Sequence, residues 1–457
     1  MKRVLFIFRR DLRLQDNLGL ISALEAGKEV ILAFIFTPEQ IEENSFRSDR
    51  SLQFMIESLE DLEIEISKHK GKLHLFYGKP EQIVQKCIQE LAVDGVFVNH
   101  DYTPYSIQRD KKIKIVCDEH AVHFQATHDL LLLPIEDTLK GDGHPYTVFT
   151  PFYKNACKSV VCKPINNIRH VYYTKSIPFA VEQSIYKKIL PQRYIQAPGG
   201  RTEGIKILNQ LQNLPTYAFE RDFPSHDKTT RLSAHLKFNT CSAREIYYAI
   251  VDRLGPYSEI IRSLFWRDFF TLIAFHFPHV FKGAFKTKFN NLKWENNEHM
   301  FNLWCQGKTG FPIVDAGMRE LNETGFMHNR VRMVVASFLI KDLHINWQWG
   351  EKYFATHLID YDPAVNNGNW QWAASTGCDA QPYFRIFNPW LQAKRFDDDC
   401  SYIKKWVPEL QSFSPAIIHR WYLEKNYELS NDYPSPIIDH SKEAATTLES
   451  YLDISLV

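Results

Sequence analysis

The spacing of apolar residues divides the 457-residue chain into parts with different periodicity. In residues 1–130, short runs of β-branched and aromatic residues alternate with amphipathic helical patterns, such as those at 51–68 and 81–91. The runs that predict strands are residues 4–8, 30–36, 73–77, 95–99 and 122–127. Because short buried strands that alternate with helices usually pair in parallel, this part predicts a doubly wound, five-stranded parallel sheet of the α/β class.

Periodicity fades between residues 131 and 203, where prolines recur and Pro198-Gly199-Gly200 follows, so we expect a connector between domains. From residue 204 onward the apolar spacing is helical. The clearest helical patterns are residues 204–211, 242–253, 260–275, 313–321 and 328–343. The chain therefore predicts an α/β domain over 1–130, an interdomain connector over 131–203 and a large all-α domain over 204–457.

The composition is typical of a soluble globular protein, with 44% hydrophobic and 24% charged residues. The 54 basic and 54 acidic residues cancel, so a nucleic-acid partner requires a locally basic surface rather than a basic protein. The first apolar run, residues 4–8, is too short for a signal peptide, and the run 333–340 is too short to span a membrane. We therefore expect a soluble, cytoplasmic protein without a membrane partner.

The cysteines are scattered along the chain without a C-x-x-C pair. They are Cys87, Cys117, Cys157, Cys162, Cys241, Cys305, Cys378 and Cys400. Free buried thiols are therefore favoured over metal ligands, and no metal site is predicted.

All ten tryptophans fall between positions 266 and 421, and two of them, Trp370 and Trp372, lie in the segment Asn366–Gly377. Two indoles between paired asparagines and small residues are not expected to fill a hydrophobic core, because a buried indole N–H needs a hydrogen-bond partner. The segment instead indicates stacking on a flat ligand or electron transfer.

The first strand is not followed by G-x-G-x-x-G, so the usual phosphate-loop argument does not predict a dinucleotide there. Small ligands are still expected at the carboxyl ends of the strands, near residues 8–17 or 99–110.

The helix predicted at 260–275 places Ser263, Trp266, Arg267 and Phe270 on one face. An amphipathic core stripe accounts for this pattern, and so does a surface that binds phosphate and stacks on bases. Both interpretations stay open at this point.

The helix predicted at 328–343 carries Asn329, Arg332 and Met333 on one face. Polar side chains on an otherwise apolar helix need partners, which are either a satisfied core network or a bound polar heterocycle.

Two further segments carry groups suited to a nucleotide. The hydroxyls of the run 229–233 precede a predicted helix, and an N-cap explains one of them but not three. Asp360 and Asp362, which flank Tyr361, are acceptors suited to ribose and ring N–H groups.

Five segments resemble the motifs of the photolyase/cryptochrome family, in order and at family-like spacing. They are Phe8–Asn17, Trp266–Phe270, Gly307–Pro312, Met327–Arg330 and Asn366–Pro389. The resemblance implies a Rossmann-like N-terminal domain, a helical FAD-binding domain and blue-light-driven electron transfer. The run Asn329–Met333 is most similar to class I cyclobutane pyrimidine dimer (CPD) photolyases, whereas the (6-4) enzymes carry paired histidines there.

The resemblance also implies residue roles. FAD binding is carried by Tyr217, Thr229, Thr230, Arg231, Leu232, Ser233, Arg332, Asp360, Tyr361, Asp362 and Asn366, the last beside flavin N5. Electron transfer from the surface to the flavin is carried by Trp294, Trp347 and Trp370. The lesion pocket is formed by Trp266, Trp372, Asn329 and Met333. DNA contacts are made by Arg221, Ser263, Trp266, Arg267, Phe270, Asn329, Arg330 and Gln392.

The implied activity is that of a deoxyribodipyrimidine photo-lyase, a carbon–carbon lyase. A pyrimidine dimer of UV-damaged DNA flips into the pocket of a monomeric enzyme, and photoexcited FADH⁻ donates the electron that splits it. The alternatives are a (6-4) photolyase, a cryptochrome-type photoreceptor, or a flavin-bearing binding protein without repair activity.

The sequence departs from the family pattern at several positions. Ser263 stands where these enzymes usually carry Glu or Gln, and Ala234 and Asn239 replace residues that are often Pro and Gly. The segment 101–110 lacks the Asn-Glu pair that marks folate-binding members and is more similar to members that use a deazaflavin, another flavin or no antenna, so the identity of an antenna chromophore (deazaflavin, flavin or folate) stays open.

Overall fold

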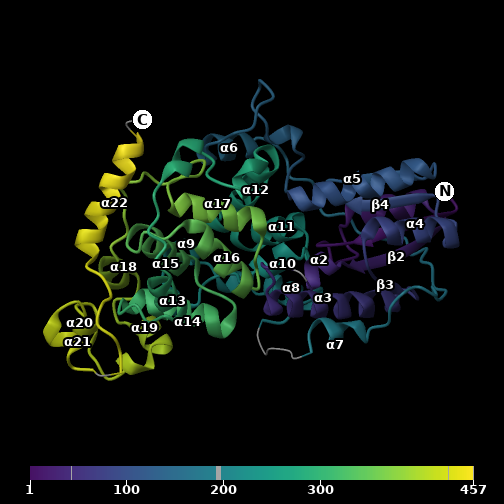
Figure 1. Cartoon of the computed structure of the whole chain (residues 1–457). Helices are drawn as coiled ribbons and strands as arrows, with labels where there is room; N and C mark the ends of the chain where they lie inside the picture. The colour runs from purple at the N-terminus through teal and green to yellow at the C-terminus, as the bar shows by residue number, and fades with distance from the viewer. Residues whose placement is uncertain (43, 192–196, 431, 456–457) are drawn as a thin grey trace. The chain divides into compact units, whose positions relative to one another are not determined.

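The computed structural model describes residues 1–42, 44–191, 197–430 and 432–455, and the chain forms two compact units (Figure 1). Unit 1 consists of residues 1–215 and 230–278, and unit 2 consists of residues 216–229 and 279–457. The predicted domain boundaries at 130 and 203 stay predictions.

Unit 1 contains the predicted five-stranded sheet. Its strands are β1 (Arg3–Phe8), β2 (Glu29–Phe36), β3 (Leu73–Tyr77), β4 (Gly95–Asn99) and β5 (His123–Thr127). All neighbours pair in parallel in the order β3-β2-β1-β4-β5. Each strand begins and ends within one residue of its predicted apolar run. The strand order reverses between β1 and β4, so the carboxyl ends of these two strands form the topological switch point where α/β proteins bind ligands.

Helices cover both faces of this sheet, as a doubly wound fold requires. The helices that follow the first four strands are α1 (Leu18–Ala26), α2 (Pro38–Ile41), α3 (Asp49–Lys68), α4 (Pro80–Leu91) and α5 (Pro104–Glu119). Apolar side chains of α4 and α5 share one core with Leu5 and Ile7 of β1. On the other face α1 comes so close that a Cβ at Gly19 would lie 3.2 Å from the ring of Phe6.

The predicted connector is not irregular throughout. It contains α6 (Phe149–Ala156), α7 (Ile185–Ile189) and the start of α8 (Arg201–Asn209). Pro151 suggested a break, but it lies in the first turn of α6, where a backbone N–H has no intrahelical partner to lose. Unit 1 is completed by α10 (Ser233–Lys237), α11 (Ala243–Leu254) and α12 (Glu259–His276).

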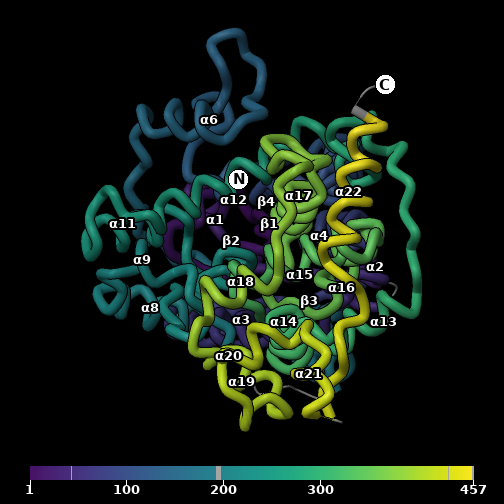
Figure 2. Tube along the Cα trace, turned by 90° about the vertical axis from the view of Figure 1, so that its left-hand side faces the viewer, coloured from purple at the N-terminus to yellow at the C-terminus, as the bar shows by residue number. Residues whose placement is uncertain are grey.

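The described residues of unit 2 form helices and no strand, in agreement with the predicted all-α fold. The longer helices are α13 (Glu298–Gln306), α14 (Pro312–Thr324), α15 (Asn329–Lys341), α16 (Trp347–His357), α17 (Pro363–Ala373), α18 (Pro389–Phe396) and α22 (His440–Ser455). Helix α15 is buried along most of its length, whereas α22 lies at the edge of the unit (Figures 1 and 2).

The expectation that the paired tryptophans make poor core residues is wrong for Trp370. Its side chain is 2% exposed and belongs to the main core of unit 2, whereas Trp372 is only partly buried. Gly350 of α16 makes this possible, because a Cβ there would lie 2.2 Å from Cη2 of Trp370.

Six of the eight cysteines are buried as expected, but Cys157 and Cys162 are exposed. Nowhere in the described ranges is there a helix long and apolar enough to cross a membrane.

Candidate functional site

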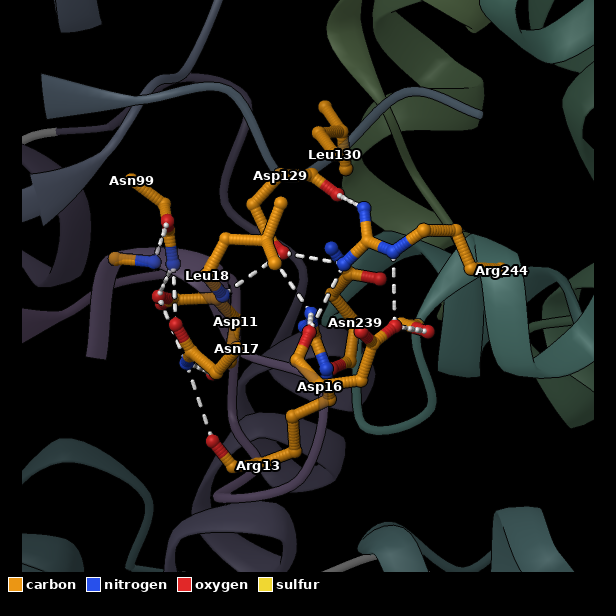
Figure 3. Close-up of polar contacts among 12 residues, drawn as sticks. Asp11, Arg13, Asp16, Asn17, Leu18, Asn99, Asp129, Leu130, Asn239 and Arg244 are labelled. Atoms are coloured by element: carbon orange, nitrogen blue, oxygen red, sulfur yellow. Dashed lines mark hydrogen bonds and ion pairs between the residues drawn. The ribbon is translucent and has the colours of Figure 1, made fainter. Parts of the chain in front are cut away.

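Residues of the segment Phe8–Asn17 take part in a buried ion-pair network in unit 1 (Figure 3). Arg13, which is 0% exposed, donates to Asp129 Oδ2 at 2.6 Å, and Arg244 donates to the other oxygen at 2.8 Å. Arg244 also donates to Asp16 at 2.9 Å. Burial acts to raise the pKa of Asp129, but its ion pairs with Arg13 and Arg244 lower it. The network joins the segments after β1 and β5 to α11. Arg13 and Asp16 therefore stabilise the fold of unit 1.

A second polar group links the carboxyl ends of β1 and β4 (Figure 3). Asn99 donates to Asp11 Oδ2 at 2.5 Å and to Asn17 Oδ1 at 2.7 Å. Burial raises the pKa of Asp11. Beside this group lies a small pocket at the predicted small-ligand position, and charged side chains of both signs line it, namely Arg9, Arg10, Asp11, Asp101 and Asp129.

Arginines near this pocket are paired with carboxylates. Arg9 donates to Asp110 at 2.8 Å, and Arg109 donates to the same carboxylate at 3.1 Å. Burial and the neighbouring Arg109 lower the pKa of Arg9. Two guanidinium groups therefore share one carboxylate.

On α12, the four residues predicted to share a face differ in their surroundings. Ser263 is exposed, Trp266 is partly exposed and Phe270 is buried in the core. The Arg267 side chain is 10% exposed, because its guanidinium donates to Asp268 at 2.9 Å and to the carbonyl of Leu130 at 2.8 Å. Phe270 therefore fits the interpretation as a core stripe, whereas Ser263 and Trp266 fit the interpretation as a binding surface.

Helix α15 presents the predicted polar residues of unit 2. Arg332 makes a bidentate ion pair with Asp360, with N–O distances of 3.2 and 2.9 Å, so the structure brings these two predicted flavin contacts together. Asn329 is exposed at the first turn, and its amide nitrogen lies 4.0 Å from the sulfur of Met333. These two predicted lesion contacts are therefore neighbours.

Helix α17 begins at the predicted carboxylates. Pro363 occupies its first position, and the Asp362 carboxylate accepts hydrogen bonds from the next two free N–H groups at 3.0 and 3.1 Å. One turn later Asn366 is 9% exposed and donates to the Glu351 carbonyl at 3.1 Å. The helix cap thus fixes the position of the Asn366 side chain.

Glu351 was not found from the sequence. Burial raises its pKa to about 7, although its carboxylate accepts a 3.0 Å hydrogen bond from Asn367. Its signal is weak, because a lone Glu among the charged residues of a helix resembles any solvated position.

The three predicted electron-transfer tryptophans lie in unit 2 and become more exposed in the expected order. Trp370 is 2% exposed, Trp347 is 4% exposed and Trp294 packs against the core while remaining partly exposed. Among the described side chains no ring contact within 6.5 Å joins these three, and the indole nearest to Trp370 is Trp304, at 6.4 Å. Their role stays a prediction.

Two predicted DNA contacts of unit 2, Arg330 and Arg221, have partners within the unit. Arg330 pairs with Asp222 at 2.8 Å and lies 4.3 Å from the ring centre of Phe396. Arg221 lies 5.9 Å from the ring centre of Tyr217. Gln392 lies on α18, partly buried.

The run of hydroxyls is divided between the units, because Thr229 belongs to unit 2 and Thr230 to unit 1. The first residue of α10 is Ser233, and no side chain caps this helix at Leu232. Arg231 has a φ of 52°, which turns the backbone just before the helix. Hydroxyls and N–H groups without an intrahelical acceptor are donors suited to a diphosphate, so this segment fits the phosphate end of FAD.

Trp266 belongs to unit 1, whereas Trp372, Asn329 and Met333 belong to unit 2. Their assembly around one lesion stays a prediction.

Comparisons with known proteins cover most of the chain. The DNA photolyase family model matches residues 4–169, and the model for the FAD binding domain of DNA photolyase matches residues 260–453. The deoxyribodipyrimidine photo-lyase of Vibrio cholerae is 36% identical over 97% of this chain and 98% of its own length.

Two solved structures are similar over nearly their whole length. An archaeal photolyase from Sulfolobus tokodaii, solved with two FAD molecules, is 42% identical with a TM-score of 0.89, over 99% of this chain and 100% of its own. A class III photolyase from Agrobacterium tumefaciens is 33% identical with a TM-score of 0.92, over 100% and 98%. Since both the α/β and the helical part are matched at this identity, the chain belongs to the DNA photolyase family.

Proposed function

We propose that this protein is a deoxyribodipyrimidine photo-lyase that repairs cyclobutane pyrimidine dimers in UV-damaged DNA. The observation that carries the proposal is the 36% identity with an enzyme of that name over 97% of this chain. The run Asn329–Met333 supports assignment to class I. We further propose that the enzyme is cytoplasmic and acts as a monomer.

The cofactor is FAD, one molecule per chain at the catalytic site. When bound in its reduced form, FADH⁻, it supplies the photoexcited electron that opens the cyclobutane ring. In unit 1 the hydroxyls of Thr230 and Ser233 are suited to its phosphates. In unit 2 Asp360 and Asn366 supply polar groups for the flavin ring, and the ion pair with Arg332 holds Asp360 in one orientation.

The tryptophans Trp370, Trp347 and Trp294 carry electrons inward to keep the cofactor reduced. The buried position of Trp370 keeps water away from an oxidised indole. The partial exposure of Trp294 lets an external reductant reach the outer end of the path.

The dimer is held outside the DNA stack. Because its two pyrimidines have lost their aromatic stacking, flipping it out costs less than flipping a normal base. Trp266 and Trp372 each offer an apolar face to it, and Asn329 and Met333 offer a polar and a soft contact. No acid or base of the protein is required, so these side chains act by positioning the dimer and excluding water.

Incubation of the reduced, FAD-loaded protein with an oligonucleotide that carries one thymine dimer tests this function. We expect dimer loss under blue light and none in the dark. The absence of light-dependent loss would overturn the proposal. Retention of the DNA without repair would indicate a binding protein, and repair of (6-4) lesions alone would indicate the related enzyme class.

We propose in addition that the carboxyl ends of β1 and β4, at the topological switch point of the sheet, bind a second flavin as antenna. The similar Sulfolobus photolyase was solved with two FAD molecules. Two flavins released per denatured chain would support this, whereas one flavin, or release of a deazaflavin or folate, would overturn it.

A further inference from the structure

Trp266 is stacked on a residue of the predicted connector. The ring of Phe149, the first residue of α6, lies parallel to the Trp266 indole, with 3.7 Å between ring centres and 8° between the planes. Phe149 is 0% exposed, whereas Trp266 is partly exposed. One face of the indole is therefore covered by the protein itself.

Other side chains of unit 1 hold Phe149 in this plane. Tyr153, one turn later on α6, is nearly parallel to it at 5.6 Å and 13°. The Arg262 guanidinium lies 5.5 Å from the centre of Phe149 and 5.6 Å from that of Tyr153. Phe269 meets Phe149 edge-on at 5.7 Å and 80°. These neighbours restrict tilting of the Phe149 ring.

The same core restricts the edges of Trp266. Phe269 meets the indole edge-on at 5.7 Å, and Phe270 lies 5.4 Å away at 33°. Trp266 nevertheless remains partly exposed, so a ligand can still reach part of the indole. An aromatic wall that is already fixed loses little side-chain entropy when a ligand packs on it.

We propose that Phe149 is a positioning residue that sets the plane of Trp266 for the pyrimidine dimer. This rests on the proposed function, in which Trp266 contacts the dimer. Phe149 itself touches no DNA, because Trp266 covers it. Its contribution is preorganisation, so its loss weakens binding of dimer DNA more than binding of undamaged DNA of the same sequence.

The test uses the full-length, FAD-loaded protein and two matched oligonucleotides, with and without a thymine dimer. For Phe149→Ala we expect up to about tenfold weaker binding of the dimer oligonucleotide, because a Trp266 indole that is no longer held in its plane loses part of a base–aromatic contact worth about 1–3 kcal/mol. Binding of the undamaged oligonucleotide should be unchanged. Phe149→Tyr keeps the flat ring, so its affinity should stay within about twofold of the wild type.

Phe152→Leu is the matched control. Phe152 is 2% exposed on the same helix and packs on Phe269 at 5.4 Å. Its ring also lies 6.2 Å from that of Phe149 at 44°, but it makes no ring contact with Trp266 in the described part of the chain. It should lower the melting temperature without changing the dimer preference. If Phe149→Ala does not fold, Phe149→Leu takes its place, because it keeps apolar volume but not the plane.

The variant Trp266→Ala distinguishes the proposed contact of Trp266 with the dimer from the positioning role of Phe149. If Trp266→Ala leaves dimer binding unchanged, the proposed function of Trp266 is wrong. If Trp266→Ala weakens binding but the Phe149 variants behave like Phe152→Leu, the role of Phe149 is wrong. We expect the double variant Phe149→Ala/Trp266→Ala to bind the dimer oligonucleotide no more weakly than Trp266→Ala alone.

A spectroscopic measurement reports on the indole directly. We expect the Phe149 variants to change the near-ultraviolet circular dichroism of Trp266, measured as the difference from a Trp266→Phe protein.

Discussion

Ser263 lies exposed one turn before Trp266, and its hydroxyl donates to the carbonyl of Glu259 at 3.4 Å. This side chain is shorter than the Glu or Gln that the family resemblance leads us to expect at this position. A longer acceptor adds a charge-assisted hydrogen bond worth about 1.5–3 kcal/mol when it reaches the dimer. We therefore predict that Ser263→Glu binds dimer DNA about tenfold more tightly and raises the repair quantum yield. An unchanged or lower yield would show that Ser263 is not a weakened contact, and Ser263→Ala is the control.

Glu351 gives unit 2 a dependence on pH. Burial raises its pKa in the folded protein to about 7 from an ordinary value of 4.5. The folded state therefore binds the proton more tightly than the unfolded state, and stability falls as pH rises between these two values.

Replacement by a neutral isostere should remove this dependence. Glu351→Gln keeps an acceptor for Asn367, so we predict similar stability at pH 5 and a gain of up to about 3 kcal/mol over the wild type at pH 8. Urea unfolding at both pH values measures the difference. A stability difference that does not change with pH would contradict the raised pKa of Glu351.

At the scale of elements, α16 and α17 approach so closely that Gly350 has no room for a side chain. Its Cβ would lie 2.2 and 2.4 Å from two ring carbons of Trp370. We predict that Gly350→Ala lowers the free energy of unfolding by about 1–3 kcal/mol, the usual cost of overpacking. Trp370→Phe removes the crowded ring carbons, so the double variant Gly350→Ala/Trp370→Phe should lose less stability than the sum of the single variants. Additive losses, measured by urea unfolding, would place the strain elsewhere.

The elements that the sequence predicts well are those with a strong apolar period. The strand at residues 95–99 and the helix at 260–275 are recovered to within one residue, because a continuous buried run and a long helical stripe have few alternatives. Helix α6 was missed because Pro151 was interpreted as a break. Phe149, the first residue of α6, was therefore missed as well. Its contact with Trp266 joins positions far apart in the chain, so no local sequence pattern predicts it.

Site residues show the same limit. Arg13 and Asp129 are ordinary charged residues in the sequence, and only the fold shows that they are buried together. The roles of Asn329, Arg332 and Asp360 came from the family resemblance, because sequence spacing alone left both a core network and a bound heterocycle open for Asn329 and Arg332. The bidentate pair of Arg332 with Asp360 depends on a contact between α15 and the segment before α17, which no local pattern contains.

At the scale of the whole molecule, the two units contain ion pairs of similar chemistry and different burial. In unit 1 both members of the Arg13–Asp129 pair are 0% exposed, whereas in unit 2 Arg319 and Glu409 are 20% and 28% exposed. Both pairs are short, at 2.6 and 2.7 Å, so burial is the main difference between them.

Removing one partner should therefore have unequal effects. We predict that Asp129→Asn costs about 3–5 kcal/mol, because it leaves Arg13 and Arg244 buried with too little negative charge. Glu409→Gln should cost about 1 kcal/mol or less, because water solvates the released Arg319.

The buried network should also depend on pH. Because the pKa of Asp129 is lowered in the folded protein, the wild type loses the stability contributed by the Asp129 carboxylate as pH falls through that pKa. The difference in unfolding free energy between the wild type and Asp129→Asn should therefore narrow in acid. Urea unfolding of both variants at neutral and acidic pH measures these differences. Equal losses for the two variants would show that the buried Arg13–Asp129 pair contributes no more to stability than the partly exposed Arg319–Glu409 pair.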